Sequence, residues 1–241
     1  NSSYLSHVGV QAPDLSVGVI LAPNEPGLDE FFAQFPDWVR EVVVIWDAEE
    51  VPGQEFTCAA PIRQLAHPLD DFASQRNRML DKCAGEWVLY LDGDERFSED
   101  VWGLLPACLL VKRLTACWFP RMTLYQDETR CKAGYGLWPD LQLRLFRNEE
   151  GVRFTRPVHE RLTGVTGRTA LVLDAPILHY SRLTKSPEVL TAKLKRFDVA
   201  SGGDISHVLN DDYPTIPRAQ LSEATFLVGS LSMLLLEENP A

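Results

Sequence analysis

The sequence predicts an α/β fold with a mostly parallel central sheet flanked by helices. Two uninterrupted apolar runs, Val42–Trp46 and Trp87–Leu91, have the composition of strands that are covered on both faces, as in a parallel sheet. Strand-like and helix-like runs alternate through the first hundred residues, which is typical of this class. The 241 residues are 45% hydrophobic and 24% charged, which suits one globular domain with a sizeable core.

The first elements follow from local patterns. Leu15–Leu21 is rich in β-branched residues and stops at a Pro-Asn turn signal, which predicts a strand. Leu28–Phe35 is expected to be a short helix, because its apolar residues recur on one face. After the Val42–Trp46 strand, a weaker strand is expected around Ile62–Leu65.

A helix is expected over Asp71–Cys83, with Asp70 or Asp71 as its N-cap. Arg76 shares one face of this helix with apolar residues, so it lies on or beside the buried stripe. Since an unpaired buried guanidinium is costly, Arg76 needs an anionic partner. A nucleotide pyrophosphate and a structural carboxylate (Asp47, Asp70 or Asp71) are equally good candidates.

The second half of the sequence is less regular. Its expected elements are three strands and one helix, over Ala116–Leu124, Leu141–Phe146, Leu171–Leu173 and Pro187–Ala200. The apolar run Ala224–Leu236 is too short for a bilayer span and is interrupted by Gly and Ser, so it predicts a packed C-terminal helix or a dimer contact. No repeat or linker divides the chain, so we expect a single domain over residues 1–241, with a helical tail over 201–241.

Charge is unevenly spread along the chain. The net charge of −11 argues against non-specific nucleic-acid binding, which requires basic faces. Residues 1–100 hold 19 acidic and 6 basic residues, whereas residues 101–168 hold 6 acidic and 11 basic ones. This middle third either faces an anionic partner or carries solvated arginines. Its basic residues include Arg121, Arg130, Lys132, Arg144, Arg147, Arg153, Arg156 and Arg161.

The five cysteines are far apart and form no CxxC pair, so neither a zinc site nor a disulfide framework is expected. The sequence does not open with a charged segment followed by an apolar one, so a secretion signal is not expected. We therefore expect reduced thiols in a cytoplasmic protein. Peripheral contact with the inner face of a membrane and a homodimer are left open.

The strongest chemical signal is the run Asp92-Gly93-Asp94, directly after the Trp87–Leu91 strand. Side chains two residues apart on an extended segment point the same way, so the two carboxylates can share a hard cation. Mg²⁺ or Mn²⁺ is usually held by one or two carboxylates together with substrate phosphates. The glycine between them lets backbone approach a ligand.

Other polar residues also follow predicted strands. Asn24 and Glu25 follow the first strand, and Asp47 follows the second. Ligands of open parallel sheets bind beyond the carboxyl ends of the strands. These residues and Asp92 should therefore converge on one crevice.

Three blocks of sequence form a specific pattern: Asp71–Asn77 (DFASQRN), Gly85–Leu89 (GEWVL) and Leu91–Arg96 (LDGDER). Shorter matches lie at Arg144–Arg147, Pro157–Glu160 and His179–Tyr180. In this pattern the chain resembles the family 2 glycosyltransferases, most of all their small bacterial members of the lipopolysaccharide-core glucosyltransferase type. The resemblance covers about residues 15–197. It implies the GT-A fold, with a nucleotide-sugar-binding half over about 15–110 and an acceptor and catalytic half over about 111–200.

The resemblance also implies a role for each matching residue on the donor side. Asn24, Glu25 and Asp47 would hold the base and ribose of a nucleotide-sugar, for which a UDP-sugar is favoured. Asp92 and Asp94 would meet the ribose and a Mn²⁺ or Mg²⁺ ion on the diphosphate. Arg76 and Gly93 belong to the same donor-binding set, and His179 would be a third metal ligand.

On the acceptor side, His159 and Glu160 fall where the family places its catalytic carboxylate. Displacement at an anomeric carbon needs a base for the acceptor hydroxyl, which we assign to Glu160, and a positive charge for the leaving diphosphate. A structural ion pair of Glu160 with Arg156 or Arg161 is the alternative, and Asp140 is the reserve base. The expected acceptor is a carbohydrate or a glycolipid. If the cationic middle third of the chain binds this acceptor, the acceptor is expected to carry a negative charge.

The predicted function is thus hexose transfer from a nucleoside-diphosphate sugar to an acceptor hydroxyl, with inversion. Two departures from the family lie on the nucleotide loops: Ala22-Pro23 precedes Asn24, and Ala48–Val51 follows Asp47. One alternative is a degenerate module that binds a sugar, a nucleotide or a partner without catalysis. A sugar-1-phosphate nucleotidyltransferase is less favoured, because the loop after the first strand is acidic rather than basic.

Overall fold

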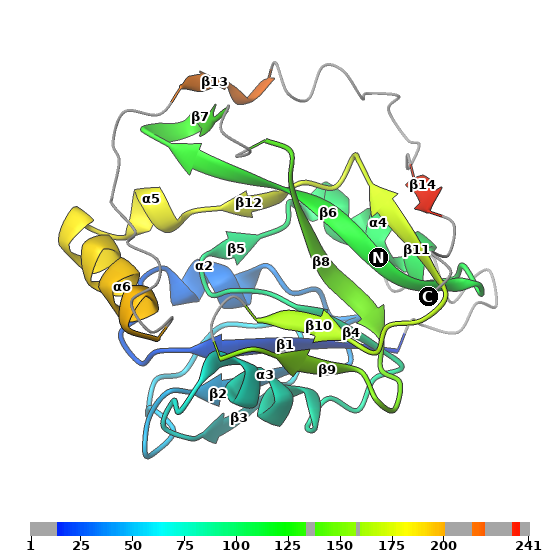
Figure 1. Ribbon diagram of the computed structural model, residues 1–241, viewed down its shortest axis with the longest axis horizontal. Coiled ribbons are helices and arrows are strands. Elements are labelled where there is room, and N and C mark those ends of the chain that lie inside the picture. The colour runs from blue at the N-terminus through cyan, green and yellow to red at the C-terminus, as the bar shows by residue number, and fades with distance from the viewer. Residues whose placement is uncertain (1–13, 134–137, 158–159, 201–213, 220–232, 237–241) are drawn as a thin grey trace.

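The computed structural model describes residues 14–133, 138–157, 160–200, 214–219 and 233–236. The first half of the chain forms a four-stranded parallel sheet (Figure 1). β1 (Leu15–Leu21) lies between β2 (Glu41–Trp46) and β4 (Trp87–Tyr90), and β3 (Ile62–Ala66) lies outside β2. These strands occupy the positions that their apolar runs predicted, which confirms the α/β prediction.

Helices cover both faces of this parallel sheet. α2 (Leu28–Ala33) and α4 (Glu99–Leu109) contribute to the core on one face, and α3 (Phe72–Leu80) packs on the other. Because alternate residues of a strand point to opposite faces, Val42 joins the first core and Val43 the second. The uninterrupted apolar run of β2 is therefore explained by burial on both sides.

The α4 helix was not expected from the sequence. Gly103 and Pro106 lie inside it, and both residue types disfavour helix interiors. Its N-cap is Ser98, whose hydroxyl accepts a hydrogen bond from the backbone N–H of Val101. The buried side chain of Trp102 also anchors it to the core, so tertiary packing outweighs the local propensity.

The second half extends the sheet through antiparallel pairing. β8 (Asp140–Arg147) pairs antiparallel with both β4 and the long strand β6 (Leu114–Tyr125). β11 (Arg168–Val172) and β12 (Ile177–His179) pair parallel with β6 near its two ends. β8 thus joins the two halves of the chain into one mixed sheet (Figure 1).

Apart from β14, the remaining elements are short, except for the 14-residue helix α6. They are β5 (Glu95–Arg96), β7 (Asp127–Lys132), β9 (Arg153–Thr155), β10 (Arg161–Thr163), α5 (Ser181–Thr184), α6 (Pro187–Ala200) and β13 (Thr215–Pro217). β5 pairs with β12, β7 pairs with β6 and β13, and β9 and β10 form a separate hairpin. The α6 helix has the bounds that the sequence predicted.

The expected C-terminal helix over Ala224–Leu236 is wrong for its last four residues. Met233–Leu236 forms β14, which pairs antiparallel with β11, and residues 224–232 lie outside the described part of the chain. A short apolar run is compatible with either helix or strand, and here the edge of β11 offers backbone partners. Within the described ranges, no helix combines the length and the apolar composition of a bilayer span. All five cysteines are free.

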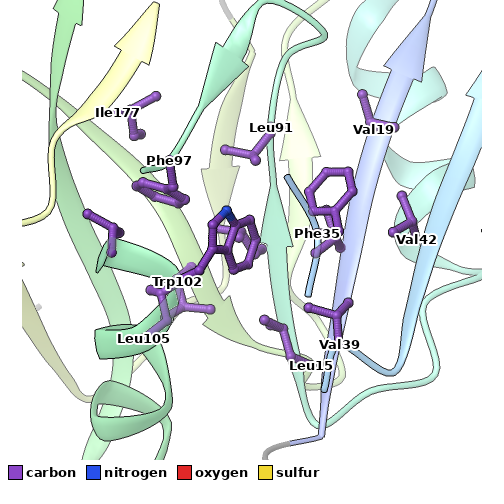
Figure 2. Close-up of a cluster of buried hydrophobic side chains, with 14 of the residues drawn as sticks. Leu15, Val19, Phe35, Val39, Val42, Leu91, Phe97, Trp102, Leu105 and Ile177 are labelled. Atoms are coloured by element: carbon purple, nitrogen blue, oxygen red, sulfur yellow. The ribbon is translucent and has the colours of Figure 1, made fainter. Parts of the chain in front are cut away.

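The main core lies between α2, α4 and the sheet (Figure 2). Trp102 of α4 packs edge-to-face against Phe35 and Phe97, with ring centroids 5.5 Å and 5.7 Å away. Leu105, one turn further along α4, is also buried in this cluster. Leu91, the residue after β4, belongs to the same cluster, so the core anchors the start of the Asp92–Asp94 loop.

This packing predicts the effect of a core truncation. Leu105→Ala should lower the free energy of unfolding by about 2–5 kcal/mol, because it removes buried methyl groups and leaves a cavity. Leu105 is 1% exposed, whereas Leu110, at the end of the same helix, is 49% exposed. Leu110→Ala is the matched control and should change the free energy by less than about 0.5 kcal/mol. Urea unfolding of both variants decides; equal losses would contradict the described core.

Candidate functional site

The loop after β4 lies tightly against the end of β1. A Cβ atom on Gly93 would lie 2.6 Å from Leu21 Cδ2 and 3.2 Å from Glu25 Cγ, so a larger residue would require these side chains to move. The loop also closes on itself, since the Asp92 carbonyl accepts a hydrogen bond from the Glu95 N–H over 2.9 Å. The absence of a side chain at Gly93 therefore lets the two aspartates lie closely against the first strand and its following loop.

Asp92 is held by two arginines from different halves of the chain. Arg76 of α3 donates from Nη2 to Oδ1 over 2.7 Å, and Arg144 of β8 donates from Nη2 to Oδ2 over 2.9 Å. Both guanidiniums also lie near the ring of Tyr90, at 5.0 Å and 4.5 Å from its centroid. Burial alone would raise the pKa of Asp92, but the two guanidiniums outweigh it and hold the pKa well below its ordinary value.

Arg76 connects Asp92 to Glu160. Its Nε donates to Glu160 Oε1 over 2.5 Å, while its Nη2 donates to Asp92. The expected structural partners of Arg76 are thus not the ones observed: Asp70 instead pairs with Arg78 over 2.6 Å. One guanidinium therefore links the predicted donor-binding loop to the predicted catalytic carboxylate.

The position of Glu160 is set by the β9–β10 hairpin, which packs on α3. The Asn77 side chain makes a reciprocal pair of hydrogen bonds with the Phe154 backbone, each 2.9 Å long. Next along the chain, the Pro157 carbonyl accepts a hydrogen bond from the Phe72 N–H over 3.2 Å. Glu160 thereby faces Arg76, and the expected pairing with Arg156 or Arg161 is not the observed one. His159 lies outside the described residues.

A second layer of charge lies behind Asp92. Glu95, fully buried, accepts from Arg144 Nη2 over 2.5 Å and from Arg121 Nη1 over 3.3 Å. Arg121 in turn reaches Asp140 Oδ2 over 2.7 Å. Burial alone would lower the pKa of Arg121, but Glu95 and Asp140 outweigh it and raise the pKa. Asp140, the reserve base, is thus held by an arginine just as Glu160 is.

Asp94 has a different cation. Lys185 Nζ lies 2.6 Å from Asp94 Oδ2 and 2.5 Å from Glu25 Oε1. His179 Nε2 lies 3.6 Å from Asp94 Oδ1, and its Nδ1 lies 3.1 Å from the Thr123 hydroxyl. Burial alone would lower the pKa of Lys185, but the two carboxylates outweigh it and raise the pKa well above its ordinary value.

Asp47 and Asn24 lie at the same edge of the sheet as this network. The Asp47 N–H donates to the Leu21 carbonyl over 2.7 Å, which places Asp47 beside the end of β1. Its Oδ1 accepts from the Leu69 N–H over 2.8 Å and so holds the segment after β3. Asn24 is exposed in the loop after β1.

The structure therefore gathers most of the predicted site. Joined by direct contacts or adjacent in the loop are Glu25, Arg76, Asp92, Gly93, Asp94, Glu160 and His179. Sequence reasoning did not assign Glu95, Arg121, Arg144 and Lys185 to this site. For the two arginines a signal existed, because both belong to the cationic middle third. No pattern in the sequence singled out Lys185.

The predicted metal ligands do not assemble into a metal site. Both oxygens of Asp92 accept from arginines, and Asp94 Oδ2 faces the Lys185 ammonium. Among the described residues, no three His, Cys, Asp or Glu side chains are grouped so as to hold a metal ion. The donor set therefore does not fit a Mg²⁺ or Mn²⁺ ion, which needs these carboxylate oxygens itself.

Comparison with known proteins finds similarity over part of the chain. No protein-family model matches the chain. Over 157 residues, it is 30% identical to the lipopolysaccharide core biosynthesis glycosyltransferase LpsC of Rhizobium meliloti. This match covers 57% of this chain and 56% of LpsC. Over 157 residues, it is also 29% identical to a TPR repeat-containing protein of Synechococcus elongatus. This second match covers 64% of this chain and 36% of that protein. The chain thus spans from about a third to just over half of these relatives.

Two of the similar solved structures are complexes with a nucleotide-sugar. S. aureus TarS 1–349 in complex with UDP-GlcNAc matches with a TM-score of 0.44 and 15% identity, over 78% of this chain and 66% of that one. The mannosyltransferase PcManGT from Pyrobaculum calidifontis, in complex with GDP-Man and Mn²⁺, matches with a TM-score of 0.34 and 19% identity. That match covers 48% of this chain and 36% of the other.

The network predicts how loss of one buried cation affects stability. Arg144→Met should lower the free energy of unfolding by about 3–5 kcal/mol at neutral pH, because it leaves Asp92 and Glu95 without a shared partner. Since the folded-state pKa of Asp92 is lowered, its contribution is present above about pH 4 and is lost as the pH falls. The deficit of the variant should therefore shrink on acidification.

Arg153→Met is the matched control for this measurement. Arg153 pairs with Asp81 over 3.1 Å, but both side chains are about half exposed. Such a surface pair contributes less than about 1 kcal/mol, so this variant should stay close to the wild type at every pH. Urea unfolding from neutral pH to about pH 3 compares the two. A deficit for Arg144→Met that is small, or that does not shrink in acid, would contradict the described network.

Proposed function

We propose that this chain is an inverting glycosyltransferase of the family 2 type with a GT-A fold, which transfers a hexose from a nucleoside-diphosphate sugar to an acceptor hydroxyl. The observation that carries the proposal is the Arg76 bridge between Asp92, in the loop at the sheet edge, and Glu160, from the second half of the chain. It brings the carboxylates that we assign to the donor side and to the acceptor side to one guanidinium. The sequence similarity to LpsC supports the same class of reaction.

On the donor side, Asn24, Glu25 and Asp47 are proposed to hold the base and ribose, with a UDP-sugar favoured. Asp92 and Gly93 complete this part of the site. Arg76 is placed to bind a phosphate oxygen, because its Nη1 is buried and has no partner among the described residues. A charged donor of this kind makes strong hydrogen bonds to phosphate. The proposal contains no step through a divalent ion, since the described carboxylates do not fit one.

On the acceptor side, Glu160 is proposed to take the proton of the acceptor hydroxyl. The hydroxyl oxygen then bonds to the anomeric carbon on the side opposite the diphosphate. The bond between that carbon and the diphosphate oxygen breaks, and the electron pair leaves with the diphosphate. The configuration is inverted, and Arg76 holds Glu160 at the site during the displacement.

The acceptor is proposed to be a carbohydrate or a glycolipid. The cationic middle third gives less support for an anionic acceptor than the sequence suggested, because its arginines pair largely with carboxylates. Arg121, Arg144 and Arg153 all do so. Arg156 and Arg161 are exposed on the hairpin that carries Glu160, and they are the better candidates for contact with an anionic group.

The proposed base predicts a specific kinetic outcome. Glu160→Gln should lower sugar transfer and UDP release from UDP-hexoses by about 100-fold or more, because the amide cannot accept the proton. Its affinity for UDP should stay within about threefold of the wild type, since the amide oxygen still accepts from Arg76. UDP release and UDP titration, each with EDTA and with Mn²⁺, measure the two effects.

Asp140→Asn is the matched control, because it makes the same change on the other arginine-bound carboxylate. It should retain most of the activity. A loss for Asp140→Asn with an unaffected Glu160→Gln would move the base to Asp140. If neither UDP- nor GDP-sugars are bound or turned over by the wild type in any condition, the transferase proposal is wrong and a non-catalytic role takes its place.

A further inference from the structure

The Lys185 ammonium lies where the sequence pattern called for a divalent ion. It touches Asp94 Oδ2 and Glu25 Oε1 at 2.6 Å and 2.5 Å. The lysine side chain is 4% exposed, that of Asp94 2% and that of Glu25 19%. This is an enclosed ion pair, and one cation neutralises two carboxylates from different loops.

A single short segment, from the end of β12 to Lys185, positions the lysine for this contact. The Tyr180 N–H donates to the Asp94 carbonyl over 2.8 Å, which docks the end of β12 on the Asp94 loop. The α5 turn follows, and its last residue leads directly into Lys185. Because His179 and Lys185 flank this turn, backbone docking at Tyr180 carries both side chains to Asp94. The lysine position is thus set by the fold, whereas a surface lysine would be free to rotate.

An ammonium and a divalent ion cannot both occupy this position. A Mg²⁺ or Mn²⁺ ion would bind the same oxygens at about 2.1 Å, and the ammonium charge would repel it. The neighbouring aspartate offers no substitute, since both Asp92 oxygens are bound by arginines. Both oxygens of Asp92 and Oδ2 of Asp94 therefore face a cation of the protein itself. The remaining oxygen, Asp94 Oδ1, lies beside His179.

We propose that Lys185 is the resident cation of the Asp94–Glu25 pair and takes the place of a divalent ion at the leaving diphosphate, so that nucleotide binding needs no metal. This inference rests on the proposed transferase function. An ammonium carries three N–H donors, and two of them serve Asp94 and Glu25. The third can be donated to a phosphate oxygen, while Arg76 Nη1 supplies a second donor.

The first test uses the protein without any nucleotide. Mn²⁺ is titrated into the wild type and Lys185→Met, and free Mn²⁺ is measured by electron paramagnetic resonance. Removal of the ammonium leaves two facing carboxylates, so Lys185→Met should bind Mn²⁺ about tenfold or more tightly than the wild type. Lys195→Met, the same change at an exposed position of α6, should match the wild type. Tight Mn²⁺ binding by the wild type itself would overturn the proposal, and this measurement requires no variant to fold.

The second test measures UDP affinity by calorimetry in EDTA and in Mn²⁺. Wild-type affinity should change by less than about threefold between the two conditions, because the ammonium already supplies the charge. Lys185→Met should lose about tenfold in EDTA and regain it in Mn²⁺, and Lys185→Arg should keep metal-independent binding. Strict dependence of wild-type binding on Mn²⁺ would overturn the role of Lys185 and leave the transferase proposal standing. If neither UDP nor GDP, titrated in the same way, binds in either condition, the transferase proposal fails, and the Mn²⁺ titration alone decides whether Lys185 is the resident cation.

Discussion

The carboxylates that follow β4 are neutralised by cations, most of which come from the second half of the chain. Asp92, Asp94 and Glu95 lie in or beside one tight turn, and an unpaired buried charge is costly. Arg144 comes from β8 and Lys185 from the segment after β12, so the turn can form in this way only when both halves are assembled. The site is therefore also an interface between the two halves of the domain.

The same contacts determine which groups face one another. Arg76 holds Asp92 with one nitrogen and Glu160 with another, while the Asn77–Phe154 hydrogen bonds fix the hairpin that leads to Glu160. Both anchors lie one residue apart on α3. A single short helix thus aligns the loop of the first half with the carboxylate of the second. In the proposed reaction, this alignment would hold the donor and the acceptor in position for direct displacement.

The Asp-Gly-Asp run shows how a motif and its environment can differ. Two carboxylates at this spacing after a strand are a good signal for a hard cation, and a cation does lie there. It is the Lys185 ammonium, which approaches from nearly a hundred residues further along the chain. Gly93 likewise has a local reason that the motif did not reveal, since a side chain at this position would overlap Leu21.

Much of the fold could be predicted from local sequence patterns. The strands β1, β2 and β4 and the helices α3 and α6 follow from apolar runs, period and caps, because these depend on neighbours a few residues apart. The α4 helix did not follow from them, since Gly103 and Pro106 oppose it locally and core packing through Trp102 outweighs their effect. β14 did not either, because its partner strand β11 lies some sixty residues earlier in the chain.

For the site, the sequence by itself determined which carboxylates stand at the strand ends and that the middle third carries an excess of arginine. Only the tertiary structure decided how these charges combine: Asp92 with Arg76 and Arg144, and Asp94 with Lys185. The physical reason is that a strand end is a local property, whereas an ion pair depends on atoms that folding brings within about 3 Å. Spacing along the chain identifies the acids, but it carries no information on which distant base will neutralise each of them.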